Sequence, residues 1–384
     1  MAEKEIHTVK EEDKKSDQRP PVKKHDIKLL DLAFAMDCTS SMGSFIASAK
    51  NNILQIVEKI VASEKSDVRL ALVNYRDHPP QDSTFVTEVH DFTPSPKTMK
   101  DWLANSSALG GGDTPEAVAD GLHDVLKLSW REEATKICVC ISDAPPHGLG
   151  ASGDCFPDGC PAGIDPMVVV NQMAEKGITL YVVGCEPSIA QYKDFFMALA
   201  YVTGGQYVPL TKANVLSQVI IGGAQEEMAL EQLMDEVNEE VQADLAAGRD
   251  IDPEEMSRRV HSKIASKGMR AKQLHRHGFE LDCASEKTEV NALSKMGSLA
   301  EVKKNFKPNT GAMAFGGGHH MRGMGGAPPP PPGARMMMAA PMMGDMGSPA
   351  VEEIYELADD MPVTYQQSSR MVQKSMARNK VSKR

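Results

Sequence analysis

A carboxylate and two hydroxyl groups lie at alternate positions just after the first strongly apolar segment of the chain. These are Asp37, Thr39 and Ser41, within Met36-Asp37-Cys38-Thr39-Ser40-Ser41-Met42-Gly43. Alternate side chains of an extended segment share a side, so these three oxygen-bearing groups should converge. A set of oxygen ligands without thiolate or imidazole suits a hard cation such as Mg²⁺ or Mn²⁺.

Two later segments carry matching oxygen ligands. Thr114 stands in Gly110-Gly111-Gly112-Asp113-Thr114-Pro115-Glu116, which opens a predicted helix, and Asp143 follows a predicted strand. Both segments should reach the carboxyl edge of a parallel sheet, where ligands bind in open α/β folds. The sequence therefore predicts one metal site formed by Asp37, Thr39, Ser41, Thr114 and Asp143. Two alternatives remain: the hydroxyls only cap helices and the acids are solvated, or the glycine loop holds a phosphate, although it lacks the lysine of a P-loop.

Residues 27 to 224 alternate short apolar runs with amphipathic stretches, which predicts an α/β fold. Some of the runs are apolar almost throughout, as expected of strands covered on both faces. We expect a doubly wound, mostly parallel sheet, followed by an α-helical hairpin and a disordered C-terminal region. The expected strands are 28–36, 68–75, 85–92, 135–142, 179–184 and a short one near Tyr207, and the expected helices are 45–62, 115–128, 167–175 and 189–201.

The predicted ligand segments resemble the metal-ion-dependent adhesion site of von Willebrand factor A domains, whose pattern is Asp-x-Ser-x-Ser with a later Thr and Asp. The resemblance covers about residues 27 to 224. Within this range, residues 74–80, 112–118 and 142–148 are similar to those of A domains found beside alpha-kinase domains. Thr39 replaces the usual serine and keeps its hydroxyl.

The resemblance implies bound Mg²⁺ (or Mn²⁺), with Ser41, Thr39 and Thr114 as direct or nearly direct ligands and Asp37 and Asp143 acting partly through water. It also implies a partner protein that presents an Asp or Glu carboxylate to the open coordination position.

Outside this region the composition changes in blocks. Residues 1–26 are a charged arm, which we expect to be flexible. Residues 225–277 form an acidic and a basic amphipathic arm, which predicts a helical hairpin that could join copies of the chain. Residues 278–310 are left unassigned. Residues 311–349 are rich in Gly, Met and Pro and are predicted to be disordered, with prolines 328–332 as a polyproline ligand or a stiff spacer. Residues 350–384 are a tail with a basic C-terminus, either a short helix or solvated.

Four residues near the predicted metal face are candidate partner contacts: Arg76, Asp77 and His78 after the second strand, and His147. For the first three, a salt-bridged turn before Pro79-Pro80 is the equal alternative.

Cys155 and Cys160 lie in a loop rich in Gly and Pro, with His147, Asp154 and Asp158 nearby. A zinc site is conceivable there, but no second Cys or His pair follows, so the pattern favours an irregular surface insertion.

The 384 residues carry a formal net charge of −11, which argues against a general nucleic-acid binder. The sequence shows no secretory signal and no apolar run of transmembrane length, and we expect a cytoplasmic protein with reduced cysteines. The most favoured function is a metal-dependent protein-interaction module rather than an enzyme. A metal-independent scaffold, or an accessory protein related to alpha-kinases without catalytic activity of its own, is the alternative.

Overall fold

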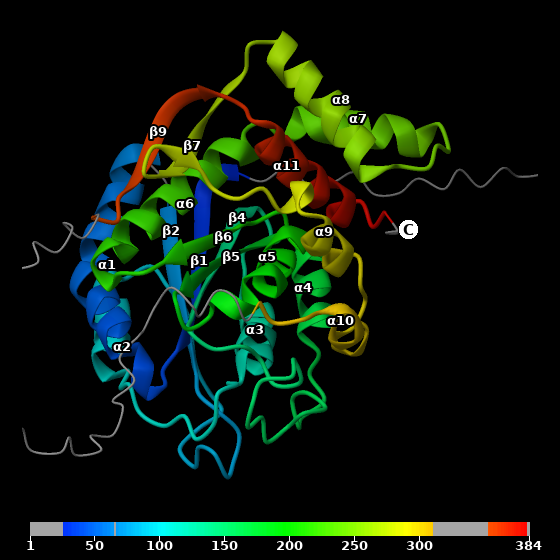
Figure 1. Cartoon of the computed structure of the whole chain (residues 1–384). Helices are drawn as coiled ribbons and strands as arrows, with labels where there is room; N and C mark the ends of the chain where they lie inside the picture. The colour runs from blue at the N-terminus through cyan, green and yellow to red at the C-terminus, as the bar shows by residue number, and fades with distance from the viewer. Residues whose placement is uncertain (1–25, 65–66, 310–351, 382–384) are drawn as a thin grey trace, which may run out of the picture.

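The computed structural model describes residues 26–64, 67–309 and 352–381. A six-stranded sheet forms the centre of the molecule, in the order β3-β2-β1-β4-β5-β6 (Figure 1). Its strands are β1 (Asp26–Asp37), β2 (Asp67–Tyr75), β3 (Thr87–Thr93), β4 (Ala134–Ser142), β5 (Ile178–Cys185) and β6 (Tyr207–Leu210). All neighbours pair in parallel except β2 and β3, so the predicted mostly parallel sheet is confirmed.

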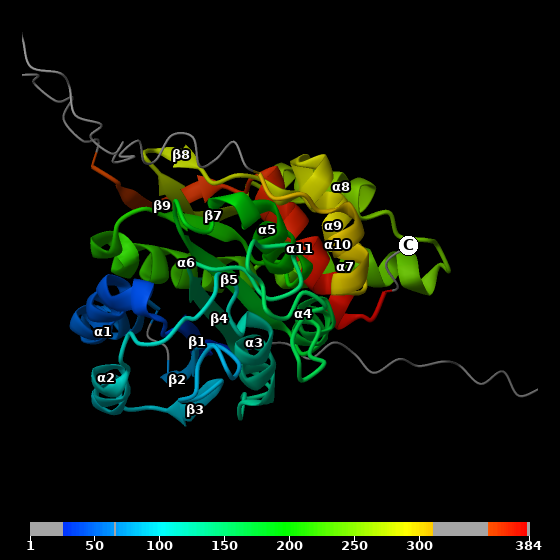
Figure 2. The same cartoon turned by 60° about the horizontal axis from the view of Figure 1, so that its bottom comes forward.

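Helices cover both faces of this sheet (Figure 2). One face carries α1 (Gly43–Glu64), α2 (Pro96–Asn105) and α6 (Leu216–Glu231), and the other carries α3 (Val118–Lys127), α4 (Pro166–Glu175), α5 (Lys193–Val202), α9 (Thr288–Ser294) and α10 (Leu299–Asn305). Strands β4 and β5 are buried at every position because helices pack on both sides of them. The fold is therefore doubly wound, as predicted.

Two predicted helix boundaries are wrong for local reasons. The helix expected at 115–128 begins only at Val118, because Glu116 is extended and forms a β-bridge with Pro146. The helix expected at 189–201 opens with a 3₁₀ turn, Ala190–Tyr192. Helix α2 was not predicted, although Ser95 caps it by accepting a hydrogen bond from the Thr98 amide and Pro96 occupies its first turn.

The predicted helical hairpin exists only in part. Helices α7 (Met234–Ala246) and α8 (Pro253–Ser266) pack together, but residues 270–276 are strand β7 (Arg270–Arg276) rather than the end of the second arm. Gly268, with a φ of +63°, ends α8 in the left-handed conformation. At the other boundary, α6 runs across residue 224 without a break, so the hairpin is not separated there from the helices on the sheet.

Of the two alternatives for the C-terminal tail, the helix is present and the solvated tail is wrong, since the segment is part of the packed structure. Strand β9 (Tyr355–Pro362) pairs with β7, which also pairs with β8 (Phe279–Glu280), in a second, three-stranded sheet. Helix α11 (Tyr365–Arg378) then buries Met371, Val372 and Met376 against the apolar stripe of α7 and α8. The same chain therefore covers this stripe, and the joining of copies through residues 225–277 stays a prediction.

Two predictions fall outside the described residues: the flexible arm, apart from Asp26, and the disordered Gly/Met/Pro segment with prolines 328–332. Within the described ranges, no helix combines the length and the apolar character needed to cross a membrane.

Candidate metal centre

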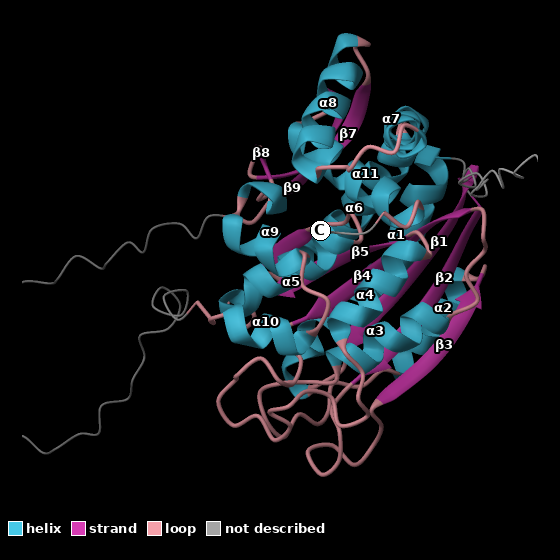
Figure 3. Cartoon of the chain, turned by 90° about the vertical axis from the view of Figure 1, so that its right-hand side faces the viewer, coloured by secondary structure: helices cyan, strands magenta, loops and turns pink. Residues whose placement is uncertain are grey.

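The predicted ligands lie at the carboxyl edge of the sheet, where β1 and β4 are neighbours. The chain leaves β1 into α1 on one face and leaves β4 toward α4 on the other. Such a reversal opens a crevice at the carboxyl ends of the two strands, which is the usual ligand position in open α/β sheets. Figure 3 shows the long loops of the chain gathered at this end of the strands.

Asp37 and Thr39 form the floor of the crevice. Asp37 is fully buried, and its Oδ1 accepts hydrogen bonds from the Thr39 amide at 2.9 Å and from the Thr39 hydroxyl at 2.6 Å. Ser142 Oγ lies 3.5 Å from the other oxygen, Oδ2. The Thr39 hydroxyl has one proton, which it uses in the hydrogen bond that it donates to Asp37. Its oxygen lone pairs therefore stay available for another ligand.

Ser41 and Asp143 make a second pair of the same kind. The Ser41 hydroxyl hydrogen-bonds to the Asp143 carboxylate, and its Oγ lies 3.4 Å from Thr39 Oγ1. Burial, followed by the negative charge of Asp143, raises the pKa of Asp37 to about 7. Burial also raises the pKa of Asp143. Neither carboxylate is paired with a lysine or arginine in the described part of the chain, so two acids share one site without a countercharge.

The glycine segment that precedes Thr114 lies directly over the floor residues. The backbone amide and the hydroxyl of Ser40 donate to the Gly110 carbonyl at 3.4 and 2.8 Å. A Cβ on Gly111, whose φ is +86°, would lie 3.4 Å from Thr39 Cβ. Thr114 itself is exposed, and within the described ranges its hydroxyl makes no hydrogen bond to the Asp37 group. The structure thus brings four of the five predicted ligands into contact and places the fifth on the adjoining loop.

Glu116 is a candidate site residue that the sequence reasoning did not single out. It is only 4% exposed, and its Oε2 has no hydrogen-bond partner. Burial, followed by the charges of Asp37, Asp77, Asp113 and Asp143, raises the pKa of Glu116 to about 10. The sequence does show an acid two residues after Thr114. Its position at the crevice depends on the β-bridge between Glu116 and Pro146, which the sequence does not reveal.

The four residues predicted to contact a partner are buried. Arg76, Asp77, His78 and His147 are 3%, 0%, 6% and 2% exposed, so their side chains do not form a partner surface. Arg76 instead ties three loops together, donating to the carbonyls of Cys38 and Ser107 and to the Thr84 hydroxyl. The salt-bridged alternative describes the group better.

His147 uses both ring nitrogens within the protein. Nε2 lies 2.7 Å from Asp77 Oδ1, and Nδ1 lies 2.9 Å from Asp154 Oδ1. Burial alone would lower the pKa of His147, but these two carboxylates raise it. The imidazole therefore serves as a buried positive charge that holds the loop after β4 against the loop after β2.

The two loop cysteines do not form one site. Cys155 is exposed, and its sulfur lies 2.7 Å from Gln81 Nε2, whereas Cys160 Sγ lies 3.7 Å from His78 Nε2. Asp158 is fully exposed. The zinc grouping conceived from the sequence, around both cysteines and His147, is therefore not assembled.

Comparison with known proteins relates part of the chain to one family. Residues 31–150 match the family described as von Willebrand factor A domain. The chain is 29% identical to the alpha-protein kinase vwkA of Dictyostelium discoideum over 41% of this chain and 27% of that protein. It is 28% identical to an ariadne-like RING finger protein of Acanthamoeba polyphaga mimivirus over 50% of this chain and 20% of that protein. The chain thus spans about a quarter or less of the length of these curated relatives.

Solved structures are similar at low identity. A pilus adhesin, SpaC from Lactobacillus rhamnosus GG, has 8% identity and a TM-score of 0.41, over 54% of this chain and 31% of that one. A von Willebrand factor type A structure from Catenulispora acidiphila has 14% identity and a TM-score of 0.36, over 53% of this chain and 43% of that one. The family match, taken with the doubly wound sheet and the acids and hydroxyls at its carboxyl edge, shows that residues 31–150 of this chain belong to a von Willebrand factor A domain.

Proposed function

We propose that the chain binds a partner protein through a divalent cation held at the carboxyl edge of the sheet. The cation would be Mg²⁺ or Mn²⁺, and its ligands would be Asp37, Thr39, Ser41, Thr114 and Asp143. The observation that carries the proposal is the pairing of each acid with one hydroxyl. The Thr39 hydroxyl donates a hydrogen bond to Asp37, and the Ser41 hydroxyl hydrogen-bonds to Asp143. The lone pairs of both hydroxyl oxygens are therefore available at a site of uncompensated negative charge.

The charge balance supports a cation in this crevice. Asp37 and Glu116 are buried acids with raised pKa values, and one oxygen of Glu116 has no hydrogen-bond partner. Buried carboxylates are normally paired with a basic side chain or a metal. Since the available donors are oxygens, the ligand set suits a hard divalent ion better than zinc or copper.

The chemistry of the partner follows from the ligand set. Hydroxyls are neutral ligands, so Mg²⁺ bound by them would remain electrophilic and would supply a coordination position for an added carboxylate. We therefore propose an Asp or Glu of another protein as the group that is recognised. The role proposed for these residues is binding, and it assigns no chemical step to them.

Thermal unfolding of the full chain tests the cation. The protein is stripped with EDTA, dialysed and then melted with increasing Mg²⁺ or Mn²⁺. A cation that binds only the folded state stabilises it by about 2.7 kcal/mol at a concentration about 100 times its Kd. We expect this increase in wild type and its loss in Asp37→Ala and Thr114→Ala.

Asp101→Ala is the matched control, because Asp101 is an exposed acid on α2, away from the crevice. It should keep the full response to Mg²⁺. If neither Mg²⁺ nor Mn²⁺ stabilises the wild-type protein, the hypothesis of a metal-independent scaffold is favoured. A response that survives in Asp37→Ala would place the ion elsewhere. A metal-dependent capture assay with peptides that contain Asp or Glu, against their Asn or Gln counterparts, then tests the partner.

A further inference from the structure

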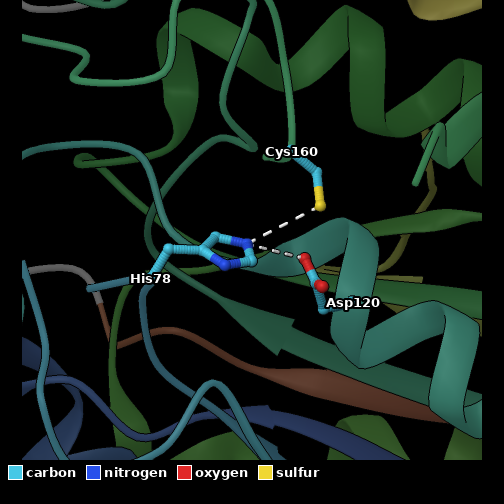
Figure 4. A group of neighbouring side chains, drawn as sticks. All are labelled: His78, Asp120 and Cys160. Atoms are coloured by element: carbon cyan, nitrogen blue, oxygen red, sulfur yellow. Dashed lines mark hydrogen bonds and ion pairs between the residues drawn. The ribbon is translucent and has the colours of Figure 1, made fainter. Parts of the chain in front are cut away.

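A second cluster of ligand-type side chains lies beside the crevice and shares none of the ligands proposed above. His78 follows β2, Asp120 lies in the first turn of α3, and Cys160 lies in the loop between β4 and α4. Figure 4 shows the three side chains pointing toward one another from these separate segments. One atom from each, Nε2, a carboxylate oxygen and Sγ, lie within 4.8 Å of one another.

The spacing of these atoms is close to that of ligands around one zinc ion. Zn–N, Zn–O and Zn–S bonds of about 2.0, 2.0 and 2.3 Å in a tetrahedron place N and O about 3.3 Å apart and N and S about 3.5 Å apart. In the structure, His78 Nε2 is 3.0 Å from Asp120 Oδ2 and 3.7 Å from Cys160 Sγ. The two distances from His78 Nε2 therefore match those around one zinc ion to within a few tenths of an ångström, and the ligand atoms of Asp120 and Cys160 lie within 4.8 Å of each other.

The same ring nitrogen meets both partners, which distinguishes this cluster from a catalytic relay. In a relay, a carboxylate holds one nitrogen of the imidazole while the other nitrogen faces the nucleophile. Here Asp120 and Cys160 both approach Nε2, so the three groups converge on a common point. His147 is different because its two nitrogens face two separate carboxylates, Asp77 at Nε2 and Asp154 at Nδ1, and no thiol.

The surroundings suit a partly buried ion with three protein ligands and one water. His78 and Asp120 are both only 6% exposed, whereas Cys160 is partly exposed. The Phe156 ring packs edge-on against His78, with centroids 5.7 Å apart, and shields the imidazole. Nitrogen, oxygen and sulfur donors together favour zinc over the hard cations proposed for the neighbouring crevice.

The loop that carries Cys160 has little regular structure of its own. Between β4 and α4 it contains five glycines with positive φ, at positions 148, 150, 153, 159 and 163, so its ordering costs much conformational entropy. A metal ligated from this loop, from the β2 end and from α3 would offset part of that cost. The loop starts at Asp143, so the cross-link would also restrain one side of the crevice.

We propose that His78, Asp120 and Cys160 form a zinc site that fastens the loop between β4 and α4 to the rest of the domain. The fourth coordination position is left to solvent on the exposed side of Cys160. This site is independent of the cation proposed for Asp37 and holds whether or not that cation binds.

The first test is zinc binding by the full chain after it has been stripped with a chelator and dialysed. We expect one tightly held zinc per chain by elemental analysis after gel filtration. Substitution by Co²⁺ should give a thiolate-to-cobalt charge-transfer band. Cys160→Ser should weaken zinc binding by more than about tenfold and abolish the band, since loss of an outer-shell partner alone costs about that much. Asp120→Asn should weaken zinc binding as well.

Cys155→Ser is the matched control, because Cys155 lies in the same loop and its sulfur contacts Gln81 rather than His78. It should keep both zinc and the band, and so should Asp37→Ala, which removes only the neighbouring site. Failure of the Mg²⁺ response alone would therefore leave the zinc proposal intact, and the reverse is also true.

Alkylation of the wild-type protein gives a second test that needs no variant. Zinc should slow the reaction of Cys160 with iodoacetamide, measured by peptide mass mapping, and leave exposed Cys155 unchanged. Absence of stoichiometric zinc, equal binding by Cys160→Ser, or equal protection of both thiols would overturn the proposal. His78 and Asp120 would then be only a buried ion pair beside a free thiol.

Discussion

At the scale of single residues, the crevice depends on how closely the glycine segment approaches Thr39. Gly111 has a φ of +86°, and a Cβ there would lie 3.1 Å from Glu116 Oε1 and 3.4 Å from Thr39 Cβ. The segment can lie over the floor because this residue has no side chain. Another amino acid would add backbone strain and would crowd the buried Glu116 carboxylate beside the proposed metal ligands.

We predict that Gly111→Ala lowers the free energy of unfolding by about 1–3 kcal/mol and reduces the stabilisation by Mg²⁺. Gly150→Ala is the control, since Gly150 has a similar φ of +80° but no atom within 4 Å of its added Cβ. Gly150→Ala should lower the free energy of unfolding through backbone strain and should keep the stabilisation by Mg²⁺. Urea unfolding with and without Mg²⁺ measures both. An unchanged Mg²⁺ response in Gly111→Ala would show that the segment does not shape the site.

At the scale of elements, one acid links the two helices of the hairpin. Asp244 of α7 is 5% exposed, and its carboxylate accepts hydrogen bonds from Arg249 at 2.9 Å and from Arg259 of α8 at 2.6 Å. Burial alone would raise the pKa of Asp244, but the two arginines outweigh burial and hold that pKa below its ordinary value. Its charged form therefore stabilises the hairpin.

The lowered pKa sets the sign of a pH dependence. The contribution of Asp244 is fully present above the pKa of an unfolded aspartate, about 3.9, and is lost as pH falls through the lower folded value. We expect Asp244→Asn to reduce the free energy of unfolding by about 1 kcal/mol at pH 7 and by less below pH of about 4. Urea unfolding at pH 7 and at low pH measures the difference, with Asp101→Asn as control. A deficit that persists unchanged at low pH would count against the ionic origin.

At the scale of the whole molecule, a buried arginine joins the C-terminal helix to the central sheet. Arg370 of α11 is 1% exposed. Its Nη2 donates to the Tyr181 hydroxyl of β5 at 2.5 Å and to Glu227 of α6 at 3.1 Å, and its Nε donates to the Gly204 carbonyl at 3.0 Å. The last segment of the chain is thus tied to the sheet and to α6, so experiments on the metal centre require the full chain.

We predict that Arg370→Met lowers the free energy of unfolding by about 3–5 kcal/mol, because it leaves two buried carboxylates, Glu226 and Glu227, with Lys374 as their one basic partner among the described residues. The added substitution Glu227→Gln should restore part of this loss, since it removes one unpaired charge. Denaturant unfolding of the two single variants and the double variant measures the coupling. Additive losses would mean that Arg370 acts by packing alone.

Local patterns in the sequence were enough to predict the doubly wound sheet and the candidate oxygen ligands. The parallel strands of the sheet are mostly local apolar runs, and their parallel arrangement fixes which end of each run carries the site. The roles of Asp37, Thr39, Ser41, Thr114 and Asp143 as metal ligands could therefore be proposed from spacing alone, and they stay a prediction. The structure supports Thr114 least of these ligands, because Thr114 is exposed on the adjoining glycine-rich loop.

Which distant residues meet depends on how the folded segments pack together. Glu116 reaches the crevice through a bridge to Pro146, and Cys160 reaches His78 across a loop that carries no periodic pattern. Arg370 belongs to a basic C-terminus predicted to be a short helix or solvated, yet its countercharges on α6 lie more than a hundred residues earlier in the chain. Contacts of this kind arise from packing between segments, and no local propensity or period encodes them.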